Sequence, residues 1–73
     1  MTHDAIGRAR RGTVSSFDEK AGLGTIAGGD DEWFFHCSSI ADGTRVVPEG
    51  ADVMFTLTPG HMGRLEARNI RPV

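Results

Sequence analysis

The side chains best suited to contact a flat ligand are concentrated in one aromatic stretch. Trp33, Phe34, Phe35 and His36 follow one another directly, and no other part of the chain is as rich in rings. Rings of this kind stack on nucleobases, so the stretch is a candidate binding surface for them. Aromatic residues also favour β-strands, and we expect a strand over residues 32–37. Alternation then places Trp33 and Phe35 on one face and Phe34 and His36 on the other.

Rings on both faces of this strand allow two interpretations. A central strand buried on both sides has a continuous apolar run. Alternatively, Trp33 and Phe35 pack in the core, while Phe34 and His36 face outward as a platform for stacking. The second interpretation adds three neighbours on the preceding strands: Phe17, Leu23 and Thr25.

Motifs typical of catalysis or cofactor binding are weak. His36 and Cys37 are adjacent, and consecutive strand side chains point to opposite faces, so we do not expect a nucleophile–base pair. Gly22 and Gly24 fit part of a dinucleotide-binding pattern, but no helix follows them. The histidines and the cysteine lack metal-ligand spacing. We therefore expect no enzyme activity, no metal, no cofactor and no small-molecule substrate.

Length and composition limit the chain to one small domain. Its 73 residues are 38% hydrophobic, which suits a globular fold with a modest core. A formal net charge of −2 argues against a protein that coats DNA through a strongly basic surface. The single cysteine excludes an internal disulfide, and no signal peptide or membrane-length apolar run is found. These features predict a cytoplasmic protein with no membrane contact.

The beginning of the chain differs from the rest. Residues 1–11 show no periodicity, and we expect them to form a flexible basic tail before a domain at residues 12–73. The tail contains three arginines, Arg8, Arg10 and Arg11. Solvated charge is the simpler interpretation of this cluster, and the alternative is an arm that attracts phosphates.

Turn-forming residues divide the remainder into short strands. The expected strands are residues 12–17, 23–27, 32–37, 51–58 and 64–70. Short connections between the first three predict an antiparallel meander, after which one helical turn carries Ile40 into the core. Closing such a sheet removes its exposed edges. The expected fold is therefore all-β, a five-stranded antiparallel Greek-key barrel.

The last two strands carry different signals. Val53, Phe55 and Leu57 alternate along the fourth strand and should share a buried face. In the last strand, Ala67 and Ile70 fall on opposite faces, so burying both requires a bend or a strand twist. The sequence does not indicate where that bend lies.

Several short segments, taken in order, resemble the bacterial cold-shock protein family. They are Gly12-Thr13-Val14, Phe17-Asp18, Gly22-Leu23-Gly24-Thr25-Ile26, Phe34-Phe35-His36-Cys37-Ser38-Ser39-Ile40, Gly50-Ala51-Asp52-Val53-Met54-Phe55 and Ala67-Arg68-Asn69-Ile70. The similarity covers about residues 12–70. Ribosomal S1-type domains share a His-x-Ser but lack the glycine-bracketed second strand, and rank second.

The resemblance implies a fold, a ligand and binding residues. The family has a five-stranded OB-type barrel that binds single-stranded RNA and DNA and acts as an RNA chaperone. By resemblance, Phe34 and His36 are stacking positions and Phe17 is a further aromatic contact. Lys20 lies in a loop where the family often has a basic residue. The full expected binding set is Arg11, Phe17, Lys20, Leu23, Thr25, Phe34, His36 and Arg64, in a monomer.

Departures from the family pattern fall on the binding face. The family usually has Lys at the position of Ser15, and aromatic residues at four others: Ser16, Leu23, Thr25 and Cys37. The aromatic that the family has in its long loop is also replaced, within residues 44–46. If three or four rings are missing at about 1 kcal/mol each, affinity falls roughly a hundredfold or more. Contacts from Arg11, Arg64 and Arg45 to phosphates would compensate in part and make binding sensitive to salt.

The same losses suggest an alternative function. A barrel of this type could be repurposed for protein–protein contacts, with Leu23, Phe34 and Met62 as an apolar docking patch. Association that depends on concentration, without a response to oligonucleotides, would favour this alternative.

Overall fold

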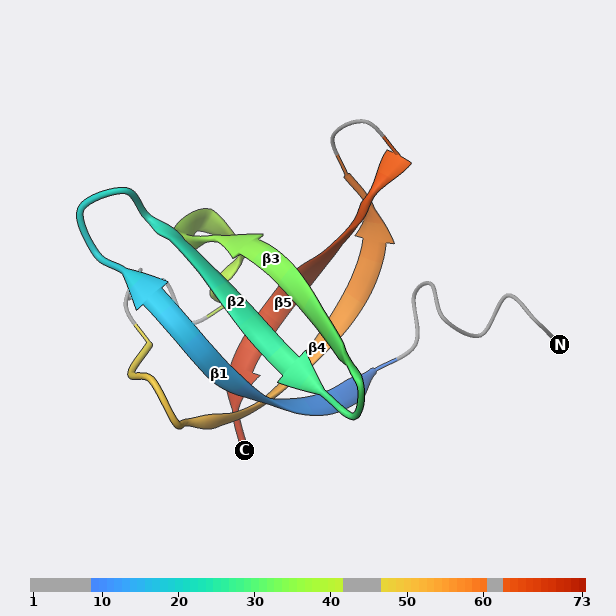
Figure 1. The fold of residues 1–73 in the computed structure, drawn as a ribbon, viewed down its shortest axis with the longest axis horizontal. Coiled ribbons are helices and arrows are strands. Elements are labelled where there is room, and N and C mark those ends of the chain that lie inside the picture. Colours follow the sequence, from blue (N-terminus) through green and yellow to red (C-terminus); the bar gives the residue numbers. More distant parts are fainter. Residues whose placement is uncertain (1–8, 42–46, 61–62) are drawn as a thin grey trace, which may run out of the picture.

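The computed structural model describes residues 9–41, 47–60 and 63–73, and these form five strands and one short 3-10 turn (Figure 1). The elements are β1 (Arg10–Asp18), β2 (Leu23–Gly28), β3 (Asp31–His36), η2 (Cys37–Ser39), β4 (Asp52–Pro59) and β5 (Leu65–Pro72). Each expected strand is therefore present, with shifted ends. Within the described residues, no helix is long and apolar enough to cross a membrane.

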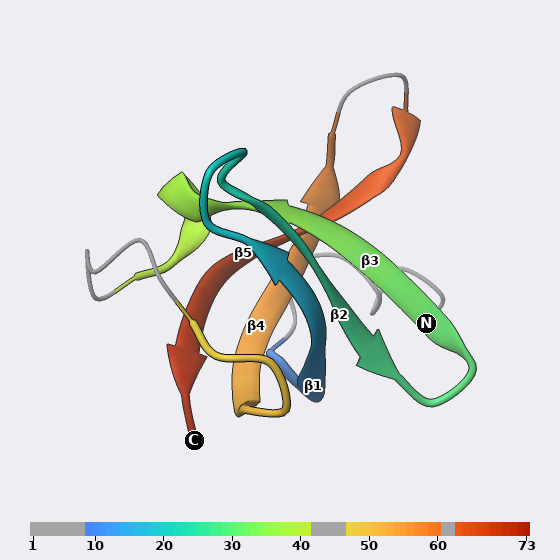
Figure 2. The same cartoon turned by 60° about the vertical axis from the view of Figure 1, so that its left-hand side comes forward.

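The strands close into a barrel in the order β1-β2-β3-β5-β4, which confirms the expected meander and Greek-key crossover. Figures 1 and 2 show β1, β2 and β3 forming one wall and β4 and β5 forming the other. One pairing, between β3 and β5, is parallel rather than antiparallel, and it consists of Phe34 opposite Glu66. A ring with an odd number of strands cannot alternate direction throughout, so one parallel neighbour is unavoidable. Among the neighbouring strands of the barrel, β3 and β5 share the fewest register positions.

The core is assembled from the inward positions of every strand. Phe35 and Phe55 are each 1% exposed, and Ile26 is 0% exposed. The alternation expected for β4 is confirmed, since Val53, Phe55 and Leu57 are all buried. The helical turn after β3 is also confirmed, and it leaves Ile40 6% exposed.

A β-bulge in β1 changes the faces of its last residues. The register with β2 shifts between Val14 and Ser16, so Ser15 and Ser16 both face solvent. An extra residue in one strand reverses the alternation beyond it. Phe17 consequently follows the inward row, where its ring stacks on that of Phe35 with 5.7 Å between centroids.

The contact between these rings passes over Gly24. Phe17 is opposite Gly24 in β1–β2, and Gly24 is opposite Phe35 in β2–β3. A Cβ at Gly24 would lie 2.6 Å from Phe35 Cζ and 2.7 Å from the Ser16 carbonyl oxygen. The absence of a side chain at this position therefore allows rings from two non-adjacent strands to meet.

The bend that buries Ile70 lies at Asn69. This residue has φ of 54°, and the β4–β5 register shifts between Met54 and Thr56, opposite it. The left-handed conformation adds a bulge, after which the inward alternation resumes at Ile70, which is 0% exposed. Asparagine is among the few residues with a side chain that adopt this conformation readily.

Replacing Asn69 with valine should destabilise the barrel by about 2 kcal/mol, because a β-branched residue is strained at positive φ. The measurement is the midpoint of urea unfolding. Asn69→Gly is the matched control, since it also removes the hydrogen bond from Asn69 Nδ2 to Thr56 Oγ1 (3.3 Å) but tolerates the backbone angle. Equal stability of the two variants would contradict the role given to the bend.

The beginning of the barrel differs from the expected boundary. β1 starts at Arg10, so Arg10 and Arg11 belong to a strand and pair with β4. Arg10 places its guanidinium carbon 5.5 Å from the Trp33 ring centroid. The rest of the expected flexible tail, including Arg8, lies outside the described residues.

Candidate functional site

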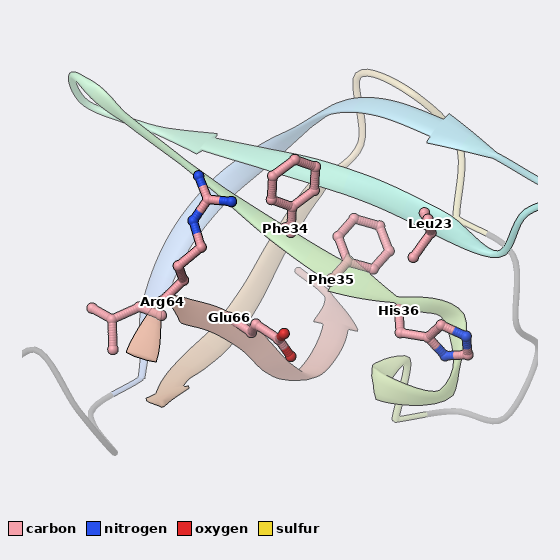
Figure 3. A pocket seen from close by; sticks show the side chains of 7 residues that line it. Leu23, Phe34, Phe35, His36, Arg64 and Glu66 are labelled. Carbon is pink, nitrogen blue, oxygen red and sulfur yellow. The ribbon is translucent and has the colours of Figure 1, made fainter. Parts of the chain in front are cut away.

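A groove of about 380 Å³ opens on the outer surface where β3 meets β5 (Figure 3). Its lining residues come from β2, β3, β5 and the segment before β5: Leu23, Phe34, Phe35, His36, Arg64, Leu65 and Glu66. The volume falls within the range of about 300–1,000 Å³ usual for small-ligand sites. It lies over the parallel seam, where β3 pairs with β5 at only one register position.

Two large apolar side chains are exposed at this groove. Phe34 is 55% exposed and Leu23 is 49% exposed. Strand pairing explains their proximity, because Thr25 is opposite Phe34 and Leu23 is opposite His36 on β2–β3. Phe34 and His36 therefore face outward together while Phe35 enters the core, as expected for a stacking platform.

Arg64 lies over the exposed ring of Phe34. Its guanidinium carbon is 6.0 Å from the ring centroid, within the range of a cation–π contact. Figure 3 shows the guanidinium beside Phe34, with Glu66 on β5 between Arg64 and His36. The site therefore combines an aromatic ring, a cation and a carboxylate.

Hydroxyl groups occupy the platform next to Phe34. Ser15 Oγ donates to Glu32 Oε2 at 2.7 Å, and it lies 2.7 Å from Thr25 Oγ1. Each hydroxyl has one proton, so Thr25 donates to Ser15, and Ser16 donates to Thr25 at 2.8 Å. These side chains form a chain of hydrogen bonds across β1, β2 and β3 that ends at the Glu32 carboxylate.

The orientation of His36 is set by Ser38, the middle residue of the following 3-10 turn. Ser38 N donates to His36 Nδ1 at 3.1 Å, and Ser38 Oγ lies 2.9 Å from the same atom. Because Nδ1 accepts, a neutral ring carries its proton on Nε2. His36 thus presents a fixed ring face and an N–H donor at one end of the groove.

The expectation that His36 and Cys37 point apart is wrong. Cys37 belongs to the 3-10 turn rather than to β3, and its Sγ lies 3.9 Å from His36 Nδ1. The strand ends before Cys37, so alternation does not apply to it. Nδ1 is closer to both donors from Ser38, which argues against a dedicated nucleophile–base pair.

Three other expected residues lie away from this groove. Phe17 is stacked on Phe35 and borders a second hollow of about 440 Å³, which is also lined by Glu19, Val47, Pro48 and Glu49. Arg11, on the β1–β4 side, has its Nη2 3.7 Å from Asp52 Oδ2. Lys20 is exposed in the turn that leads into Leu23.

The structure thus brings together Leu23, Thr25, Phe34, His36 and Arg64. Sequence reasoning did not identify Glu66 or Glu32 as part of the surface. Alternation along β3 places Glu32 on the face of Phe34, which was a usable signal. No such signal existed for Glu66, because its position depends on the pairing of β3 with β5. Arg45, Met62 and residues 44–46 lie outside the described residues.

Comparisons with known proteins agree with this arrangement. The chain matches the model of the 'Cold-shock' DNA-binding domain family over residues 10–73. It belongs to the cold-shock domain family. The family assignment therefore covers all five strands and begins where β1 begins.

Similar proteins are found in two bacteria. A cold shock-like protein CspA from Stigmatella aurantiaca is 42% identical over 65 residues, covering 85% of this chain and 94% of that protein. Cold shock protein ScoF from Streptomyces coelicolor is 44% identical over 64 residues, covering 84% and 94%. Among solved structures, drosophila Unr CSD456 superposes with a TM-score of 0.74 and 26% identity, covering 90% of this chain and 27% of that chain. This cold-shock domain thus corresponds to about a quarter of the drosophila structure.

Proposed function

We propose that this cold-shock domain binds single-stranded RNA and DNA at the β3–β5 groove, in the manner of an RNA chaperone and without catalysis. The observation that carries the proposal is the exposed ring of Phe34, 55% accessible in a chain whose other described phenylalanines are partly or fully buried. Such a ring provides a face for any base. Family membership supports nucleic acid rather than protein as the ligand.

The residues divide into stacking and phosphate-contacting groups. Phe34 and His36 stack on bases, Leu23 adds an apolar contact, and Thr25 lies beneath the bound nucleic-acid strand. Arg64 at the groove and Lys20 in the turn before Leu23 contact phosphates of the bound strand. Arg11 and Phe17 lie on other sides of the barrel. They contact a nucleic-acid strand that is long enough to extend beyond the groove.

Affinity should be lower than for a platform with a full set of rings. Hydroxyls stand at Ser16 and Thr25, and Glu32 adds a carboxylate to the same face. Each aromatic ring that is missing removes roughly 1 kcal/mol or more of base stacking. Several such losses together lower the binding affinity about a hundredfold. The carboxylate also repels phosphates, and this repulsion lowers affinity most at a low salt concentration, where it is least screened.

The experiment that tests the proposal is a titration with heptathymidine at low salt, followed through backbone amide chemical shifts. Shifts should cluster at Leu23, Thr25, Phe34 and His36, and they should diminish as salt is added. Absence of shifts at millimolar oligonucleotide would refute nucleic-acid binding at this groove.

Replacing Phe34 with alanine should weaken heptathymidine binding by about five- to 150-fold, the loss of roughly 1–3 kcal/mol expected for one stacked base. The domain should remain folded, because the ring is outside the core. Met54→Ala is the control, since Met54 is half-buried on β4 and lines neither hollow. Unchanged affinity in the Phe34 variant would move the stacking surface elsewhere.

A further inference from the structure

The groove contains a carboxylate whose position the proposed function does not use. Glu66 is the β5 residue paired with Phe34, and this pair is the whole of the β3–β5 register. Its side chain is half-buried and packs over Gly60, where an added Cβ would overlap its carboxyl group. This packing restricts the conformations of the Glu66 side chain and keeps its carboxylate at the groove.

A base stacked on Phe34 would have its edge close to this carboxylate. Neighbouring strands lie roughly 5 Å apart, which is less than the width of a base. A carboxylate has two oxygens and about four acceptor sites, so contacts that Glu66 already makes within the protein are compatible with a ligand. Single-stranded bases expose their Watson–Crick edges to contacts of this kind.

The chemistry of the carboxylate selects among bases. Guanine presents two adjacent donors, N1–H and the N2 amino group, and both oxygens can accept from them together. Thymine and uracil have one N–H between two carbonyl oxygens, which repel the carboxylate. Cytosine and adenine place a ring nitrogen acceptor beside their amino group. A carboxylate therefore matches guanine best.

Arg64 completes the site from the opposite side of the ring. Its guanidinium carbon is 6.0 Å from the Phe34 centroid. A base between two flat groups needs about 7 Å, or two contacts of about 3.5 Å. Arg64 is exposed, so its side chain can move by the missing ångström. The base would then stack on Phe34 below and on the flat face of the guanidinium above, while the N–H groups at the edge of the guanidinium stay available to a phosphate.

From these contacts we infer that the β3–β5 groove is selective for guanine, with Glu66 reading its Watson–Crick edge while Phe34 and Arg64 hold its faces. This inference rests on the proposed single-strand binding and adds a base preference to it. The carboxylate makes Glu66 a specificity-determining residue.

The test compares heptanucleotides that differ at one central base. Heptathymidine is the reference, and the central thymidine is replaced by deoxyguanosine, deoxyinosine, deoxycytidine or deoxyadenosine. The guanine oligonucleotide should bind about five- to 150-fold more tightly than heptathymidine, as for a bidentate contact to one base. Inosine lacks the N2 amino group and should lose most of that gain.

The Glu66→Gln variant distinguishes recognition of the guanine edge from a general effect of the carboxylate charge. Glutamine has a single acceptor, and its amino group can donate to a thymine carbonyl, so the variant should bind guanine less tightly and thymine more tightly. Glu49→Gln is the matched control, because it removes the same charge beside the other hollow. It should change both affinities by the same small factor.

Three results would overturn the inference. The first is equal affinity of the wild type for guanine and thymine oligonucleotides. The second is a Glu66→Gln variant that binds all heptanucleotides more tightly by one common factor, as expected if the carboxylate only repels phosphates. In both cases single-strand binding itself would stand. The third, failure of the wild type to bind any heptanucleotide, would refute the proposed function together with the inference.

Discussion

Replacing Phe35 with alanine is expected to cost about 3–5 kcal/mol of folding free energy, the usual range for removing a buried phenylalanine. The ring is 1% exposed and stacks on Phe17 over Gly24, so a cavity would open at the centre of the barrel. A domain of 73 residues has a total stability of roughly 4–11 kcal/mol. The variant should therefore lose roughly a quarter or more of the domain's total stability.

Urea unfolding followed by tryptophan fluorescence measures this effect, since Trp33 packs 5.5 Å from Phe55 at the core. Phe34→Ala is the matched control from the next position of the same strand. It should shift the free energy of unfolding by less than about 1 kcal/mol, because its ring is 55% exposed. Similar losses in the two variants would mean that β3 is buried on both faces.

Adding aromatic rings to the platform should raise the affinity for single-stranded nucleic acid. Leu23→Phe combined with Thr25→Phe places two rings on β2 beside Phe34 and His36. At about 1–3 kcal/mol for each stacked base, heptathymidine affinity should rise at least about 30-fold. The change at Thr25 also removes the hydroxyl that joins Ser15 and Ser16, which costs about 1 kcal/mol per hydrogen bond in stability.

Titration calorimetry with heptathymidine measures the gain, and Met54→Phe is its control. That substitution adds a ring of the same size on β4, outside the groove. If Met54→Phe raises affinity as much as the double variant, added hydrophobicity rather than the platform accounts for binding. If the double variant gains nothing while staying folded, bases do not stack on β2.

Local sequence patterns were sufficient to predict most elements of the fold. Alternation in β4 identifies its buried face without reference to any other strand. Short turn-rich connections identify the β1–β2–β3 meander, and the pairings confirm it. These signals are local, because the period of a strand and the preferences of turn residues depend on a few neighbouring positions.

Local sequence patterns were not sufficient to predict the position of the Phe17 ring. The sequence predicts Phe17 beside Phe34 at the end of the first strand, and uninterrupted alternation from the buried Val14 would turn its ring outward. The bulge at Ser15 and Ser16 reverses the faces beyond it, and neither serine marks a bulge by its identity. The inward position becomes favourable only because Gly24 leaves room for Phe17 to meet Phe35.

The sequence by itself determined the all-β class, the succession of strands and the fact that Phe34 and His36 share one face. Only the tertiary structure decided that this face is outward. The tertiary structure alone decided what surrounds those rings. Arg64 and Glu66 reach Phe34 through the single parallel pairing of β3 with β5. That pairing follows from closing an odd number of strands, a constraint on the whole barrel that no local pattern encodes. The groove and the charges that line it therefore exist only once the barrel has closed.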